Sequence, residues 1–185
     1  MKEKKQRLFF ALSPASHCEA FHRLARLSSQ CGQFGRPVAA DNLHITLAFL
    51  GMVTDEQTNT IVAAAKQLAP PPPFSLQLTT LGYWKRSKVI WLAPERPPQP
   101  LLALAQQLSS LAIDCGLEQE SRPYKPHITL AKSVARRPER LPAFDKIDFH
   151  FKHFGLYISK PVSHDGRQGV QYHRIDQWPL GSRQQ

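Results

Sequence analysis

The sequence has few cysteines, few acidic residues and no long apolar run, and each shortage excludes a class of protein. Only three of the 185 residues are cysteine, Cys18, Cys31 and Cys115, and none forms a CxxC pair. This rules out a disulfide framework and predicts reduced thiols in a cytoplasmic protein. No apolar run reaches the roughly 20 residues that a membrane-spanning helix needs, so we expect no membrane partner.

Acidic residues are scarce relative to basic ones. The chain has 14 Asp and Glu against 24 Lys and Arg, which gives a formal net charge of +10 at pH 7. Such an excess predicts a polyanionic partner, with nucleic acid as the leading candidate. The alternative is a basic surface that only aids solubility. At 42% hydrophobic residues, the chain has enough apolar content for one globular domain.

Hydrophobic periodicity predicts an α+β protein. Strands are expected at 7–12, 43–50, 74–83, 88–92, 126–133, 147–159 and 170–178. Ser13 and Pro14 predict the start of a helix that runs to about residue 30. Thr54 and Gln57 match a capping box before a second helix, and a third helix follows at 101–115. The elements do not alternate as in βαβ folds, which favours antiparallel sheets.

The most informative feature is an internal repeat. The pentapeptide His-Ile-Thr-Leu-Ala occurs at 44–48 and again, identically, at 127–131. An Arg-Pro pair precedes each copy, at 36–37 and 122–123. Chance gives an identical pentapeptide in a chain of this length on the order of once in a hundred cases, so a duplicated half-domain is expected.

If each copy is a strand, its side chains alternate between two faces. His44 and Thr46 then share one face, His127 and Thr129 do the same in the second copy, and the apolar residues fill the opposite face. A pseudo-twofold axis would bring two imidazoles and two hydroxyls together across a cleft. One imidazole can take a proton from water while the other donates one to a leaving oxygen, and the hydroxyls can bind phosphate oxygens.

These motifs resemble the 2H phosphoesterase superfamily, and most closely its bacterial RNA 2′,3′-cyclic phosphodiesterase branch, long called 2′-5′ RNA ligase. The likeness also involves Arg7-x-Phe9-x-Ala11, the stretch from Arg36 to Gly51 and the stretch from Arg122 to Lys132, and it extends from about residue 7 to 178. It implies one bilobal domain over residues 1–185, with two pseudo-symmetric antiparallel-sheet lobes, outer helices and a central cleft. Each lobe would hold one HxTx motif, at 44–47 and 127–130.

The resemblance also implies an activity: metal-independent hydrolysis of RNA 2′,3′-cyclic phosphate ends to 2′-phosphates, with no cofactor. Transferred to this sequence, His44 is the general acid and His127 the general base, although the residues leave this division of labour open. Thr46, Thr129 and Lys132 would bind the phosphate. Lys132 stands where relatives commonly have Arg, and by strict alternation it points away from the cleft unless the strand ends or bulges there.

Further residues are candidates for contacts with RNA. Phe9 and Tyr124 are expected to stack on a base, with core packing as the alternative for Phe9. Trp84 and Trp91 would hold an RNA strand or anchor a hairpin. The basic residues that could line an RNA path are Arg36, Lys85, Arg86, Lys88, Arg122, Lys125 and Lys132. The histidine pairs 17/22 and 150/153 do not share faces, and no metal site is expected.

The sequence leaves two other functions open. The same site supports 2′-5′ RNA ligation if a ribose hydroxyl replaces water, and a catalytically inactive cleft would leave an RNA-binding module. Cleavage of 2′-5′ oligoadenylates, within the same superfamily, is also open. The sequence predicts a monomer, since it has no obvious dimer helix, and it does not identify the physiological RNA.

Overall fold

The structure is a computed structural model that describes residues 5–164 and 167–181. Its helices are α1 (Cys18–Cys31), α2 (Asp55–Gln67) and α3 (Gln99–Asp114), with a 3-10 turn, η1 (Ala40–Asn42). Its strands are β1 (Lys5–Leu12), β2 (Arg36–Pro37), β3 (Ile45–Thr54), β4 (Phe74–Leu78), β5 (Thr80–Trp84), β6 (Val89–Ala93), β7 (Ile128–Lys132), β8 (Ile147–Phe151), β9 (His153–His164) and β10 (Arg167–Pro179). The predicted α+β class with antiparallel sheets is confirmed.

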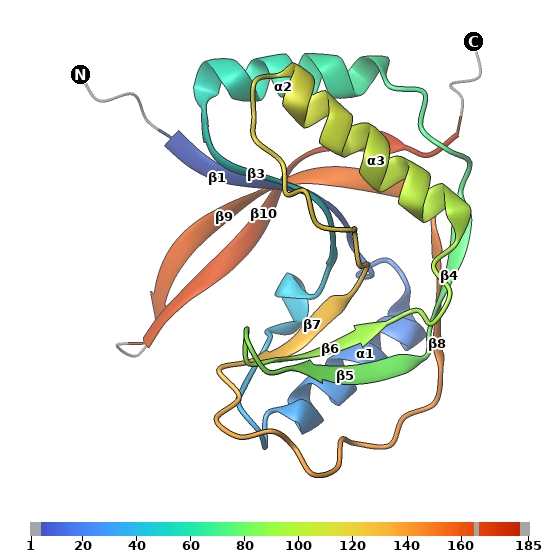
Figure 1. The fold of residues 1–185 in the computed structure, drawn as a ribbon, viewed down its shortest axis with the longest axis vertical. Helices are drawn as coiled ribbons and strands as arrows, with labels where there is room; N and C mark the ends of the chain where they lie inside the picture. Colours follow the sequence, from blue (N-terminus) through green and yellow to red (C-terminus); the bar gives the residue numbers. More distant parts are fainter. Residues whose placement is uncertain (1–4, 165–166, 182–185) are drawn as a thin grey trace.

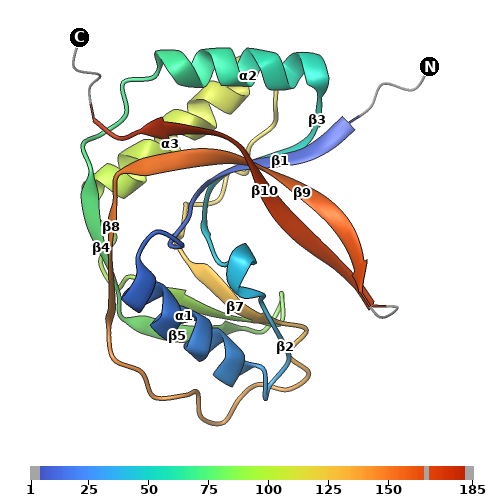
Figure 2. The same cartoon turned by 180° about the vertical axis from the view of Figure 1, so that it is seen from behind.

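The main sheet consists of two groups of strands that meet at one narrow point. Its order is β10-β9-β1-β3-β7-β6-β5, with β2 paired to β7, while β4 and β8 form a separate pair. In the described part of the chain, β3 and β7 share only one antiparallel residue pair, Ile45 with Ile128. Figures 1 and 2 show the two groups diverging from this point, with α2 and α3 over one and α1 against the other. Each group holds one copy of the repeat.

The core residues explain why the helices lie on the outside. On β1, Leu8, Phe10 and Leu12 are fully buried on the face of the sheet that also holds the Phe154 and Trp178 rings. The helices α2 and α3 cover this first group of strands, and their buried residues belong to the same apolar core. Burying one face under helices leaves the opposite face of each group free to carry polar groups.

Two predicted strands are each two strands, and the cause is a slip in hydrophobic alternation. Residues 74–83 divide into β4 and β5, because buried positions at every second residue end at Leu78 and the next apolar residue, Leu81, comes three positions later. Residues 147–159 divide into β8 and β9 with the same spacing of three between Phe151 and Phe154. Since strand side chains have a period of two, such a slip marks a change of sheet partner.

Two predicted boundaries are also wrong. Helix α1 begins at Cys18 rather than at Ser13, because residues 14–17 form a turn closed by a bond from the His17 amide to the Pro14 carbonyl, 3.1 Å. Strand β3 continues past Gly51, which has a φ of 72° that glycine adopts without strain.

Other sequence predictions are confirmed. The capping box at Thr54 and Gln57 is present with both bonds, at 3.1 Å each. The β5–β6 hairpin turns at residues 85–88, and Cys18, Cys31 and Cys115 are free thiols. None of the described helices is long and apolar enough to cross a membrane.

Candidate active site

The two repeat histidines are held in the same way by the backbone. His44 Nδ1 lies 2.7 Å from the carbonyl of Asn42, and His127 Nδ1 lies 2.8 Å from the carbonyl of Lys125, in each case two residues upstream. A carbonyl only accepts hydrogen bonds, so each Nδ1 carries the proton. Each neutral ring therefore has an unprotonated Nε2, the nitrogen that can accept a proton from a reacting group.

Burial makes both imidazoles weak bases. Desolvation lowers the pKa of His44 to about 4, an effect that the bond to Asn42 opposes and that the charges of Lys132 and His127 increase. Desolvation also lowers the pKa of His127, against the bond to Lys125. Both rings are therefore neutral at pH 7 without substrate. The effect of the His127 charge on the pKa of His44 shows that the two rings lie close together.

The threonines accompany the histidines on the same face. His44 and Thr46 flank Ile45, His127 and Thr129 flank Ile128, and these two isoleucines pair across β3 and β7. Thr46 Oγ1 lies 3.0 Å from His44 Nε2. In the described residues, His127 Nε2 has no corresponding partner.

Each copy of the repeat contains a β-bulge at its leucine. Thr46 and Ala48 pair with consecutive residues of β1, which leaves Leu47 as the extra residue, and Thr129 and Ala131 pair with consecutive residues of β6, which leaves Leu130 extra. A bulge reverses the alternation that follows it. Lys132 therefore lies on the face of Thr129, whereas strict alternation would have placed it on the other face.

Two arginines lie close to Lys132. Burial lowers the pKa of its amine, and the charges of Arg36 and Arg7 lower it further. Arg36 pairs directly with Lys132 across β2 and β7. The Arg7 guanidinium lies 4.8 Å above the ring of Phe49, the residue of the first repeat that corresponds to Lys132. Within the described residues these three cations form no ion pair with a carboxylate, so the region suits a phosphate group.

The 2′-5′ RNA ligase superfamily matches residues 13–160. The chain is 38% identical over 176 residues to the RNA 2′,3′-cyclic phosphodiesterase of Escherichia coli strain K12, a match that covers 95% of this chain and 97% of the relative. The chain belongs to the 2′-5′ RNA ligase superfamily.

Structures of superfamily members agree with this assignment. A crystal structure of E. coli LigT complexed with 3′-AMP superimposes with a TM-score of 0.84 at 36% identity, over 96% of this chain and 99% of that one. A relative from Methanocaldococcus jannaschii, also named RNA 2′,3′-cyclic phosphodiesterase, is 26% identical over 93% of this chain and 99% of its own. The likeness covers nearly the whole length of these superfamily members.

Phe9, which was expected to stack on a base, does not fit that role. Phe9 is 3% exposed, with its ring centroid 4.9 Å from His44, 4.9 Å from Tyr172 and 5.7 Å from Tyr157. A ring enclosed on these sides has no free face for a nucleobase. The Phe9 ring instead packs against the His44 imidazole, so the core-packing alternative applies.

Tyr124 is half-buried, and its hydroxyl donates to the Thr46 carbonyl at 2.9 Å. Burial raises the pKa of this hydroxyl, so it stays a donor at neutral pH. The bond connects the segment before the second repeat to the middle of the first. The stacking of the Tyr124 ring on a base stays a prediction.

The other expected RNA contacts lie on the β5–β6 hairpin and in the segment before the second repeat. Trp84 lies edge-on to His127, with centroids 4.6 Å apart, and packs against Trp91. The turn residues Lys85, Arg86 and Lys88 are exposed, as is Lys125. Arg122 forms a surface ion pair with Glu120 at 2.6 Å, so its Arg-Pro pair is not equivalent to the one in β2.

Sequence reasoning missed Asn42 and Tyr172. The Asn42 side chain donates to the Val170 carbonyl at 2.7 Å and accepts from the Tyr172 amide at 3.0 Å, which fixes the carbonyl that holds His44. The Tyr172 ring lies edge-on to His44, 5.0 Å away. No local pattern identifies either residue, because β10 follows η1 by about 130 positions in the chain.

Proposed function

We propose that this protein hydrolyses RNA 2′,3′-cyclic phosphate ends to 2′-phosphate ends. The observation that carries the proposal is the matched pair of histidines. Both present an unprotonated Nε2 to one site, because each Nδ1 donates to a carbonyl two residues upstream. An acid and a base of the same chemical type, related by a pseudo-twofold axis, suit an in-line displacement at phosphorus. The activity named for the relatives supports the same reaction.

In the proposed reaction, His127 Nε2 takes a proton from water as the water oxygen bonds to phosphorus. The bond from phosphorus to the 3′-oxygen breaks, and His44 gives its Nε2 proton to that oxygen. The products are a 2′-phosphate and a 3′-hydroxyl, with one water consumed. The unoccupied Nε2 of His127 supports its role as base, and the anionic phosphate beside His44 would raise its low pKa and supply the protonated form.

The threonines and Lys132 would bind the phosphate oxygens that gain charge in the transition state. The Thr46 hydroxyl lies beside His44 Nε2. Thr129 and Lys132 lie on the same face of β7 because of the bulge at Leu130. Arg7 and Arg36 extend this positive region.

RNA in the cytoplasm, bound by a protein monomer, is the proposed context. The net charge of +10 supports a polyanionic substrate, and the free thiols suit a reducing compartment. The 3′-AMP complex of the E. coli relative supports recognition of a nucleotide.

End-group analysis tests the proposal directly. A short RNA with a 2′,3′-cyclic phosphate is incubated in excess chelator with wild-type protein, His44→Ala, His127→Ala and, as a matched control, His22→Ala on the exposed side of α1. We expect 2′-phosphate from wild type and His22→Ala, and a loss of at least about 100-fold in each site variant. A cyclic end that survives wild-type protein, or equal activity in all four proteins, would contradict the proposal and leave an RNA-binding module.

The superfamily's description favours a second candidate, 2′-5′ ligation, in which an RNA 5′-hydroxyl attacks in place of water. Addition of an RNA with a 5′-hydroxyl end to the same assay would yield a 2′-5′ joined product. Water greatly exceeds any RNA end in concentration, so we expect hydrolysis to dominate.

A further inference from the structure

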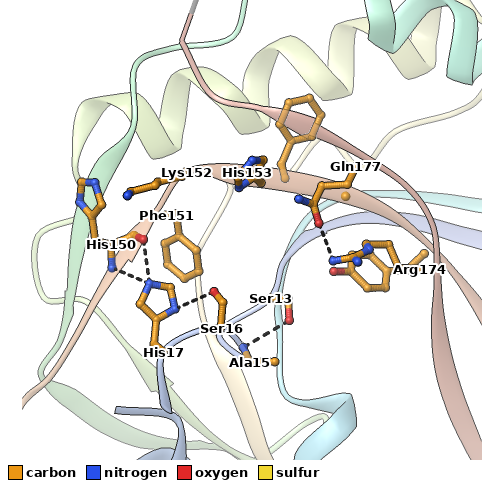
Figure 3. Close-up of a pocket in the computed structure, with 13 residues that line it drawn as sticks. Ser13, Ala15, Ser16, His17, His150, Phe151, Lys152, His153, Arg174 and Gln177 are labelled. Carbon is orange, nitrogen blue, oxygen red and sulfur yellow. Dashed lines mark hydrogen bonds between the residues drawn. The ribbon is translucent and has the colours of Figure 1, made fainter. Parts of the chain in front are cut away.

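A cavity of about 670 Å³ lies next to the site, on the face of the sheet that carries Phe9. Its walls come from the segment between β1 and α1, from the junction of β8 and β9, and from β10 (Figure 3). This volume lies within the range of about 300–1,000 Å³ that is typical of small-ligand sites. The reaction proposed above does not use it.

The lining of the cavity is basic. It includes Lys152 and Arg174, three histidines and two serines and, among the described residues, no Asp or Glu. The Arg174 guanidinium donates to the Gln177 side-chain oxygen, which orients it without neutralising it. In the part of the chain that the structure describes, the one ion pair lies elsewhere, at Arg122 and Glu120. Uncompensated cations beside hydroxyls predict an anionic ligand.

Part of this lining is rigid. The His17 ring contacts the Phe149 and Phe151 rings edge-on, and its Nε2 lies 2.7 Å from the carbonyl and 3.2 Å from the amide nitrogen of His150. These contacts fasten the start of α1 to β8. The wall opposite Arg174 therefore does not depend on a mobile side chain (Figure 3).

An aromatic ring connects the cavity to the catalytic histidine. Tyr157 lines the cavity and stacks on Phe9, with centroids 5.7 Å apart, and Phe9 lies 4.9 Å from His44. The Tyr157 ring has room only because residue 155 is glycine, since a Cβ there would lie 2.9 Å from the ring. The rings of Phe9 and Tyr157 therefore lie between His44 and the cavity.

We propose that this cavity binds the nucleotide that precedes the cyclic end of the RNA. A chain that ends in a 2′,3′-cyclic phosphate continues only in the 5′ direction, so the neighbouring nucleotide must leave the site along the protein surface. Its phosphodiester would lie against Arg174 and Lys152, and its base against Tyr157. The inference rests on the proposed function, and it makes oligonucleotide ends the preferred substrate over cyclic mononucleotides.

The test compares two substrates, 2′,3′-cyclic AMP and a trinucleotide RNA with a 2′,3′-cyclic phosphate. The variants Arg174→Gln and Lys152→Gln change exposed side chains, and Arg96→Gln and Lys66→Gln remove exposed cations outside the cavity as controls. We expect each cavity variant to raise KM for the trinucleotide on the order of tenfold and to leave the mononucleotide within about twofold. The slope of log affinity against log salt should fall by about 0.7 for each phosphate that a variant no longer neutralises.

Equal losses on both substrates, or none on the trinucleotide, would overturn the inference. If wild-type protein hydrolyses neither substrate, the proposed function fails instead. In that case the cavity is tested by fluorescence anisotropy with a labelled trinucleotide that ends in a 3′-phosphate. Weaker binding by Arg174→Gln and Lys152→Gln, with the two control variants unchanged, would still support the cavity. Unchanged binding would overturn it.

Discussion

Leu47 and Leu130 occupy the same position in two related strands, and each is the extra residue of a β-bulge. Both side chains are buried, at 4% and 0% exposure, as is the alanine that follows each. Both bulges reverse the alternation of side chains between the two faces of the sheet. Residues 49 and 132 therefore each lie on the face of the threonine in their own copy of the repeat. The repeat thus places an aromatic ring on one side of the site and an amine on the other.

Lys132 should therefore contribute to phosphate binding. Lys132→Met is expected to lower kcat/KM for a cyclic-phosphate RNA by about 10- to 100-fold, because the variant lacks a partly buried cation beside the phosphate. Lys132→Arg should retain most of the activity. Lys66→Met, at an exposed lysine of α2, is the control. Steady-state kinetics in which Lys132→Met matches this control would rule out a direct role.

Asn42 is expected to position His44 through the backbone. Asn42→Ala removes the bonds to Val170 and Tyr172 and should cost about 1–3 kcal/mol in the free energy of unfolding. The effect on kcat should exceed that on KM, because the Asn42 carbonyl holds the His44 tautomer. Nitrogen-15 NMR of the His44 ring would detect the loss of this tautomer as a weaker Nδ1–H signal. Asn59→Ala, at an exposed position of α2, is the control. An unaltered His44 spectrum in Asn42→Ala would refute the positioning role.

The low pKa of His44 predicts a pH-dependent stability. A histidine with a folded pKa of about 4 and an unfolded pKa of 6.5 binds fewer protons in the folded state, so stability falls as the pH drops from 6.5 towards 4. The loss from this residue should reach about 2–3 kcal/mol. Urea unfolding at several pH values should show a flatter profile for His44→Gln than for wild type. His22→Gln should follow wild type; parallel profiles for all three proteins would contradict the prediction.

Gly82 provides space for the indole of Trp91. A Cβ at this position would lie 2.2 Å from the Trp91 ring. We expect Gly82→Ala to destabilise the fold by about 1–3 kcal/mol and to lower the melting temperature by about 2–4 °C per kcal/mol. Catalysis should also fall, because Trp91 supports Trp84, which contacts His127. Gly169→Ala, whose nearest contact is an ordinary 3.6 Å, is the control for a thermal melt. Equal melting temperatures would show that the indole can shift.

The sequence alone determined the repeat, the α+β class and the strand face that histidine and threonine share in each copy. These are local properties, because an identical pentapeptide with strand alternation has the same two faces wherever it folds. The capping box is also a local property, because Thr54 and Gln57 lie three residues apart. The family likeness rested on the same motifs.

Only the tertiary structure decided which face Lys132 occupies, that Phe9 is enclosed, and that Asn42 holds the His44 site together. A bulge depends on the register of a neighbouring strand, so no pattern within 127–132 reveals it. Burial of Phe9 and the bonds of Asn42 depend on β9 and β10, which lie more than a hundred residues away along the chain. Contacts of such separation arise from sheet pairing rather than from local propensity.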